Sequence, residues 1–148
     1  MRPVLPTGRP RGLAAALVAL LLLLSQAGCS GGDGPLGAGP VPAGVWGSDG
    51  ANLTVAADGA TLELSCASGI VQRALLMDAD GGFQADGTYG RVGGAVPPGG
   101  VFPRYAAVFQ GKVAGDVLTL TVHPSGGDPD LGPYALRRGR RGQIFFCP

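Results

Sequence analysis

Residues 51–66 read ANLTVAADGATLELSC, two runs of alternating apolar and polar side chains on either side of Asp58-Gly59. Alternation with a period of two is typical of strands with one buried face, because successive side chains of a strand point to opposite sides of the sheet. An Asp-Gly pair supplies the left-handed backbone conformations of a tight hairpin turn. The stretch therefore predicts a β-hairpin, and its apolar face is formed by Leu53, Val55, Leu62, Leu64 and Cys66.

The rest of residues 44–148 continues in the same style, with short alternating runs separated by turns rich in Gly, Pro and Asp. Such a succession predicts an all-β domain, because Gly and Pro break helices and mark hairpins. The expected strands are 45–56 (one kinked strand), 61–66, 70–78, 83–89, 105–113, 118–123, 132–138 and 142–147. About eight strands joined by hairpins favour a single small up-and-down barrel or a two-sheet sandwich, and we expect the barrel. Its interior is either filled with side chains or encloses a small ligand, and both remain open.

The N-terminus has the composition of an export signal. Arginines and prolines occupy residues 1–12, and the apolar run LAAALVALLLLL follows at 13–24. A run of this length fits the hydrophobic region of a signal peptide and is short of the ~20 residues that a membrane-spanning helix needs. We therefore expect residues 1–28 to be a cleaved signal peptide and the protein to be exported.

Ala27-Gly28-Cys29 resembles the end of a bacterial lipobox, in which small residues precede a cysteine that becomes diacylated, with Gln26 where lipoboxes usually carry Leu. The resemblance implies a lipoprotein of the bacterial cell envelope, anchored to a membrane through Cys29, because more than one acyl chain suffices for stable anchoring. Ordinary signal cleavage after Ala27 is the alternative, and it would leave a soluble secreted or periplasmic protein. Residues 29–43, rich in Gly and Pro, predict a flexible tether.

The pairing of the three cysteines depends on the role of Cys29. In an oxidising compartment paired cysteines are expected, and if Cys29 carries the lipid, Cys66 and Cys147 are left as a disulfide pair. That bond brings the two ends of the domain together and so closes the barrel. Its loop of about 80 residues is worth roughly 4–5 kcal/mol in the chain-entropy model. A metal site is the rival interpretation, but no two cysteines stand at ligand spacing and His123 is the sole histidine, so we expect neither a metal nor a cofactor.

The charge of the mature chain argues against a nucleic-acid partner. Three of the eleven basic residues, Arg2, Arg9 and Arg11, lie in the expected signal, which leaves a weakly acidic remainder. Proteins that bind a phosphate backbone need a basic surface. We expect a monomer that meets the membrane through its anchor and binds a protein or a small molecule.

Gly44-Val45-Trp46 begins the expected domain. It resembles the Gly-x-Trp start of lipocalin-like (calycin) barrels, in which the Trp plugs one end. The resemblance implies that an arginine from late in the barrel, Arg137 or Arg138, packs over Trp46. The order of signal, Gly-x-Trp, eight strands and terminal Cys is also similar to small exported bacterial proteins of unassigned function and, more loosely, to periplasmic protease and lysozyme inhibitors.

Two motifs carry chemically active side chains but favour simpler interpretations. A hydrolytic triad built on His123 would need Ser48 or Ser125 as nucleophile, and no serine lies in a Gly-x-Ser-x-Gly elbow. The position of His123 opposite the apolar face predicts an exposed strand end. Residues 78–82 (DADGG) begin like a calcium loop, but the sequence that follows lacks its other ligands, so we expect a hairpin turn.

Two surface features are candidates for contact with a partner. One is the arginine cluster at residues 137–141, which is either an anion-binding patch or a solvated hairpin turn. The other is the apolar Pro/Gly loop at residues 90–103, which is either a binding rim or a loop folded over one end of the barrel. The candidate contact residues are Trp46, Phe102, Arg137, Arg138, Arg140 and Arg141.

No catalytic constellation emerges, so we expect a non-enzymatic, envelope-tethered binding or interaction module. The first alternative is a periplasmic or extracellular inhibitor of a protease or lysozyme, with residues 30–43 or 90–103 entering the cleft of the enzyme. The second is a carrier of a small apolar ligand, which requires an interior cavity.

Overall fold

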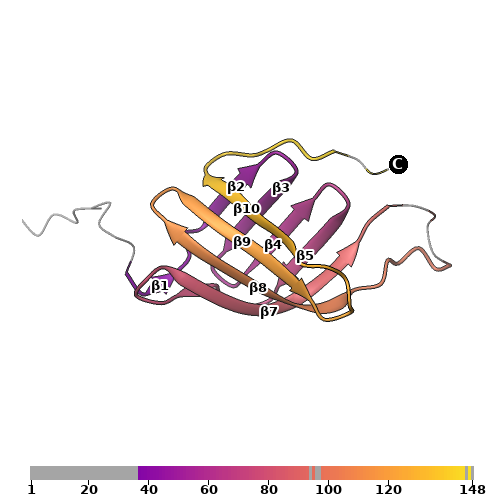
Figure 1. Ribbon diagram of the computed structural model, residues 1–148, viewed down its shortest axis with the longest axis horizontal. Coiled ribbons are helices and arrows are strands. Elements are labelled where there is room, and N and C mark those ends of the chain that lie inside the picture. Colours follow the sequence, from indigo (N-terminus) through magenta and orange to yellow (C-terminus); the bar gives the residue numbers. More distant parts are fainter. Residues whose placement is uncertain (1–36, 94, 96–97, 146, 148) are drawn as a thin grey trace, which may run out of the picture. The chain divides into compact units, whose positions relative to one another are not determined.

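The computed structural model of the protein describes residues 37–93, 95, 98–145 and 147. Within this part of the chain there are strands and no helix, and so none long and apolar enough to cross a membrane. The strands (Figure 1) are β1 (Gly39–Pro40), β2 (Gly44–Ser48), β3 (Ala51–Ala56), β4 (Gly59–Leu64), β5 (Ala67–Val71), β6 (Leu76–Met77), β7 (Gly82–Arg91), β8 (Tyr105–Ala114), β9 (Val117–Pro124) and β10 (Leu131–Arg138).

Eight of these strands form a closed antiparallel barrel in the order β10-β2-β3-β4-β5-β7-β8-β9, and β9 pairs back onto β10. The predicted all-β, eight-strand barrel is confirmed. Strand pairing itself closes it: Arg137 lies opposite Gly47 and Arg138 opposite Trp46, and the Gly139 N–H donates to the Val45 carbonyl at 2.7 Å. Closure leaves no long sheet edge exposed.

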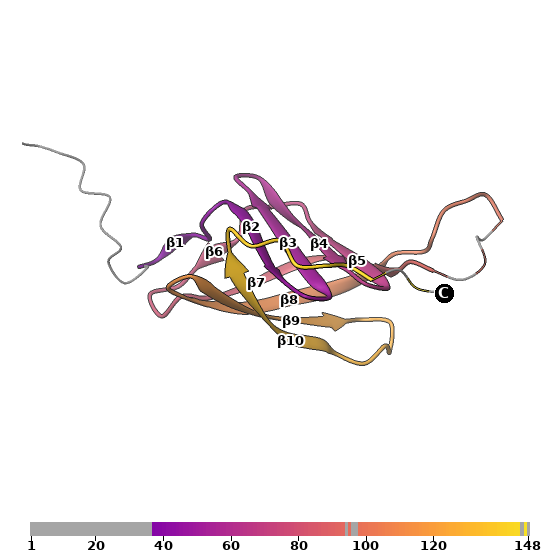
Figure 2. The ribbon, with the colours of Figure 1, turned by 90° about the horizontal axis from the view of Figure 1, so that it is seen from above.

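The antiparallel order separates two ends of the barrel. The turns β2–β3 and β4–β5, the loop at residues 92–104 and the loop at residues 125–130 lie at one end, which we call the mouth. The remaining turns and the short β1–β6 pair lie at the opposite end, which we call the closed end. Figures 1 and 2 show β1 at one extremity and the long loop with the C-terminus at the other.

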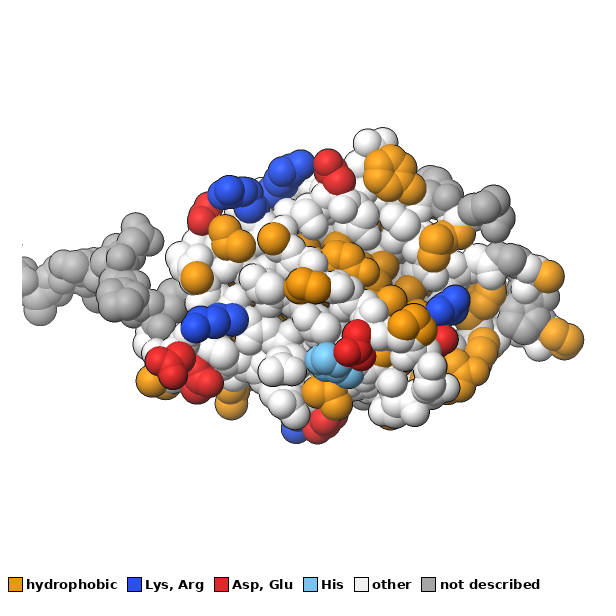
Figure 3. Space-filling view, viewed as in Figure 1, with side chains coloured by type: hydrophobic (Ala, Val, Ile, Leu, Met, Phe, Trp, Pro, Cys, Tyr) orange, Lys and Arg blue, Asp and Glu red, His pale blue; other side chains and the backbone are white. Residues whose placement is uncertain are grey.

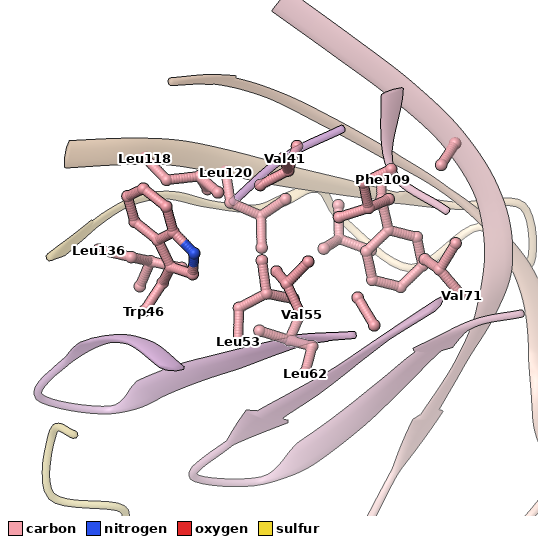
Figure 4. Close-up of a cluster of buried hydrophobic side chains, with 14 of the residues drawn as sticks. Val41, Trp46, Leu53, Val55, Leu62, Val71, Phe109, Leu118, Leu120 and Leu136 are labelled. Carbon is pink, nitrogen blue, oxygen red and sulfur yellow. The ribbon is translucent and has the colours of Figure 1, made fainter. Parts of the chain in front are cut away.

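The interior of the barrel is filled with side chains. Alternate residues of every barrel strand point inward, and the largest of them converge on one another in Figure 4. Those with almost no exposure include Trp46, Leu53, Leu62, Phe109, Leu118, Leu120 and Leu136. Of the two outcomes that the sequence left open, the structure has the filled barrel.

Trp46 plugs the closed end. Its side chain has no solvent exposure, and its indole Nε1–H donates to the Pro42 carbonyl at 3.0 Å. Val41 is also buried and donates its N–H to the Leu75 carbonyl at 2.8 Å. The packed domain therefore reaches back into residues 39–43, which were expected to belong to the flexible tether.

The predicted kinked strand at residues 45–56 is two strands. β2 and β3 pair with each other from Gly44↔Val55 to Ser48↔Ala51, and the turn between them contains Gly50 with φ +87°. A positive φ is a conformation that glycine adopts without the steric cost of a side chain. Asp49-Gly50 thus makes a hairpin turn that the alternation pattern alone did not separate from a kink.

The described residues of the predicted strand at 142–147, which are 142–145 and 147, are not in a strand. Their N–H and C=O groups bond to single side chains and turn atoms rather than to a neighbouring ladder. Cys66 likewise lies in the β4–β5 turn, just after the strand that it was expected to end. The barrel still has eight strands because one predicted strand divides and another is lost.

Candidate functional site

A pocket of about 440 Å³ opens at the mouth of the barrel. It lies among the ends of β4, β5, β7 and β10 and is open to solvent. Its walls are mostly apolar, and they include the phenol rings of two tyrosines and one guanidinium group. The lining residues are Gly50, Leu64, Ser65, Cys66, Ala67, Tyr89, Arg91, Leu131 and Tyr134.

An irregularity in β10 brings Leu131 and Tyr134 into this pocket together. Residues three apart on a regular strand point to opposite faces. Here Leu131 pairs with Val122 and Tyr134 with Leu120, so β10 has one residue more than β9 over this interval. This irregularity is a β-bulge, which changes the direction in which side chains point. The bulged interval contains Gly132, whose φ is +103°. Both side chains therefore pack against the core.

Arg91 supplies the charge at the edge of the pocket. Its guanidinium lies 3.3 Å from Asp128 Oδ1. The interaction with the nearby Tyr89 side chain, followed by the negative charge of Asp128, raises the pKa of Arg91 above its usual value. Nearly two thirds of the Arg91 side chain remains exposed, so the guanidinium stays charged and reachable from solvent.

The two tyrosines line the pocket at different depths. Tyr89 is almost completely buried, whereas Tyr134 is partly buried beside it. Burial, and next the proximity of Tyr89, raises the pKa of Tyr134 above its usual value. Tyr134 thus presents a neutral hydroxyl, able to donate and accept a hydrogen bond, at neutral pH.

The C-terminal segment, residues 139–147, packs along the outer face of β2–β4 toward the mouth. Asn52 is buried beneath it: its Oδ1 accepts the Gly142 N–H at 2.7 Å, and its Nδ2 donates to the Gly142 carbonyl at 3.0 Å. The Gly50 N–H donates to the Gln143 carbonyl at 2.8 Å. Sequence reasoning missed Asn52, because a polar residue on the outer face of a strand carries no local sign of burial.

The disulfide between Cys66 and Cys147 is present, as predicted, with the two Cα atoms 5.5 Å apart. It joins the end of the C-terminal segment to the β4–β5 turn. Cys66 also lines the mouth pocket. The bond therefore fixes the C-terminal segment beside the pocket, while the pairing of β10 with β2 closes the barrel.

The predicted arginine cluster does not act as one patch of free charge. Arg137 pairs with Asp116 at 3.3 Å, Arg140 with Asp49 at 3.3 Å and Arg141 with Glu63 at 2.7 Å. Figure 3 shows acidic side chains next to the basic ones on this part of the surface.

Arg138 has a different environment: its guanidinium carbon lies 5.9 Å from the centre of the Trp46 ring. The packing of a late arginine over the Trp is thus found, with Arg138 rather than Arg137. Such a cation–π contact is worth about 0.5–1 kcal/mol at an exposed site.

The structure does not bring the predicted contact residues into one site. Trp46 is sealed inside the closed end, and Phe102 lies half-buried in the loop at the mouth. Arg91, Tyr89 and Tyr134 were not predicted, because nothing in the local pattern indicates that two strands far apart in sequence meet at the mouth. Cys29 and the expected signal peptide lie outside the described residues.

The two motifs with chemically active side chains make local contacts. Nδ1 of His123, on the outer face of β9, lies 2.8 Å from Asp130 Oδ1. Oδ1 of Asp78 accepts the N–H groups of Asp80 and Gly82 at 2.9 and 2.8 Å. Residues 78–82 thus form the turn into β7. In the described part of the chain, no three His, Cys, Asp or Glu side chains are grouped as metal ligands would be.

Comparisons with known proteins add no relative to this picture. No protein-family profile matches the chain, and no match of significance was found among curated proteins or solved structures.

Proposed function

We propose that the protein is a non-enzymatic binding module of the bacterial cell envelope that holds its ligand at the mouth of the barrel. The observation that carries this proposal is the mouth pocket, an apolar hollow of about 440 Å³ with a few polar groups at its edge. Sites for small molecules have volumes of about 300–1,000 Å³ and the same mixture of apolar walls and few polar groups.

The filled interior supports the mouth as the place of binding. Phe109, Leu120 and Leu62 occupy the space in which a carrier would enclose its cargo. A ligand at the mouth would contact Leu64, Leu131 and Tyr134 and remain partly exposed. We therefore favour a module that presents or senses a ligand over a carrier that encloses one.

The position of the N-terminal strand supports a tethered module. β1 lies at the closed end, opposite the mouth. A tether that leads from a lipidated Cys29 into β1 would therefore leave the mouth accessible. This arrangement suits a module that meets its ligand away from its own anchor.

The environment of His123 supports a role without catalysis. Its Nδ1 is engaged by Asp130 on the outer face of the barrel, and the mouth pocket is lined by β4, β5, β7 and β10, not by β9. A general base must reach the proton that it removes within hydrogen-bond distance. His123 is thus poorly placed to act on a ligand held at the mouth.

The test compares ligand retention by two variants of the full-length protein purified from its own envelope. We expect a native mass spectrum of the wild-type protein to contain a bound small molecule. Leu131→Asp, which places a charge in the mouth pocket, should remove that molecule. Leu76→Asp, at an exposed leucine of the closed end, should retain it. A molecule retained equally by both variants would contradict binding at the mouth.

A further inference from the structure

We infer that the mouth pocket selects an amphipathic ligand that has an apolar body and one acidic group, and that Arg91 binds the acidic group. This inference rests on the proposed function and names the class of its ligand. It places the apolar body against Leu64 and Leu131 and the acid at the edge of the pocket, within reach of the guanidinium.

The pocket separates apolar from charged contacts. Leu64, Ala67 and Leu131 supply its apolar surface, whereas Arg91 and the tyrosine hydroxyls supply its polar groups. A wholly apolar ligand would displace water from these polar groups without offering hydrogen bonds in return, which costs free energy. A ligand that carries one acid satisfies both surfaces.

Arg91 has hydrogen-bond donors to spare. A guanidinium group carries five N–H donors. Arg91 contacts the Asp128 carboxylate through one nitrogen at 3.3 Å. Bidentate pairing with a second carboxylate or a phosphate therefore remains possible, and charge-assisted bonds of this kind are about twice as strong as neutral ones.

Arg104 makes a useful contrast on the same barrel wall. Its guanidinium donates to the Ser68 hydroxyl and carbonyl and to the Thr88 hydroxyl and carbonyl, at 3.1–3.4 Å. These bonds engage its donors in holding the long loop to β5 and β7. Arg91 is the arginine that lines the mouth pocket.

The charge of Asp128 leads to a second expectation about the affinity for an acidic ligand. Its carboxylate is the acidic partner of Arg91 and one third exposed, so it competes with an incoming acid for the same guanidinium. Removing its charge should strengthen the binding of an acid, while removing the charge of Arg91 should weaken it.

The experiment measures the binding of 4-phenylbutyrate and 4-phenylbutanol to the full-length protein by isothermal titration calorimetry. The two probes share an apolar body and differ in the acid. We expect the acid to bind at least tenfold more tightly than the alcohol. Arg91→Gln should bring the two affinities within about twofold, and Asp128→Asn should tighten the acid severalfold. Arg73→Gln, which breaks an exposed pair with Asp86, is the matched control and should leave the selectivity unchanged.

Other outcomes separate this inference from the proposed function. Equal binding of both probes, lost in Leu131→Asp, would overturn the acid selectivity and leave a binding site at the mouth. Selectivity that survives Arg91→Gln, or acid binding that Asp128→Asn does not tighten, would overturn the role of the Arg91 charge. Failure of both probes to bind would also overturn the inference, and the native mass spectrum would then judge the proposed function independently.

Discussion

The side chain of Asn52 holds the C-terminal segment, which does not form a strand, against the barrel. Both polar atoms of its amide bond to the backbone of Gly142, ninety residues later, so one side chain supplies the donor and the acceptor that a neighbouring strand would have offered. Among the described residues, Asn52 is the polar residue that is buried, with 1% of its surface exposed. A buried amide is stable only when its hydrogen bonds are made.

We expect Asn52→Ala to lower the free energy of unfolding by about 1–3 kcal/mol, because the Gly142 N–H and C=O lose their partners in a buried place. Urea unfolding followed by the fluorescence of Trp46 measures the change. Thr54→Ala, at an exposed position of the same strand, should stay within about 0.5 kcal/mol of the wild type. Equal effects of the two substitutions would contradict the role given to Asn52.

Tyr134 predicts how stability depends on alkaline pH. Its pKa is raised in the folded protein, mainly by burial, so the folded state holds this proton more tightly than the unfolded state. The resulting stability is fully present below the unfolded pKa of about 10 and is lost as the pH rises through the folded pKa.

We expect the urea midpoint of the wild-type protein to fall above about pH 10, and Tyr134→Phe to reduce that fall. Tyr105→Phe, at a half-exposed ring, serves as the control. Parallel midpoint curves for the wild type and Tyr134→Phe would show that Tyr134 does not titrate as its burial implies.

Single residues also show what the alternation of apolar and polar side chains can predict. Alternation predicted correctly that Leu53, Leu62 and Leu118 face the core. It did not predict that Leu131 and Tyr134 share a face, because one bulged residue reverses the facing of everything beyond it.

The C-terminal segment is the element on which the sequence and the structure differ most. Residues 142–147 were predicted to be a strand, and the disulfide of Cys147 was predicted because Cys66 and Cys147 are left as a pair if Cys29 carries the lipid. The structure has the disulfide without the strand. A covalent bond needs only two cysteines in reach, whereas a strand needs an unpaired neighbouring ladder, and pairing of β10 with β2 has already closed the barrel.

We expect reduction of the Cys66–Cys147 bond to lower the free energy of unfolding by about 4–5 kcal/mol at most, the chain-entropy value for a loop of this length. In Cys147→Ser the Gly50 amide, bonded to the C-terminal segment, should exchange its proton faster. The Gly139 amide, bonded across the seam to Val45, should stay protected.

Hydrogen exchange distinguishes the two ways of closing the barrel. Faster exchange at Gly139 in Cys147→Ser, to the same degree as at Gly50, would mean that the disulfide holds the seam. Peptide mapping without reductant provides the control, because it should link the peptides that contain Cys66 and Cys147 in the wild-type protein.

The whole barrel has two unlike ends. Trp46 is buried at the closed end, where it bonds to the Pro42 carbonyl, while a pocket opens at the mouth among the ends of β4, β5, β7 and β10. Hydrophobic side chains gather around the mouth in Figure 3, and those exposed there include Val92, Val101, Tyr105 and Phe145. This asymmetry suits the proposed function, in which the tether joins one end of the barrel and the ligand binds at the other.

The proposed anchor predicts where the whole molecule is found. We expect wild-type protein in the membrane fraction of its host and Cys29→Ala in the soluble fraction, since the acyl chains provide the attachment. Cys66→Ala, which leaves Cys29 in place, should remain in the membrane fraction. Unchanged fractionation of Cys29→Ala would contradict the lipid anchor.

The sequence by itself determined the all-β class, the disulfide pair and the position of Trp46 in the core, and it favoured a barrel of about eight strands although two of the predicted strands were wrong. These follow from patterns of period two, from turn residues and from a count of cysteines, which are local or compositional signals. Only the tertiary structure decided that the barrel is filled, that its mouth is open, that Asn52 bonds to Gly142 and that Arg91 lines the mouth pocket. These features depend on contacts between residues far apart in the chain, and no local periodicity records which strands meet or what lies between them.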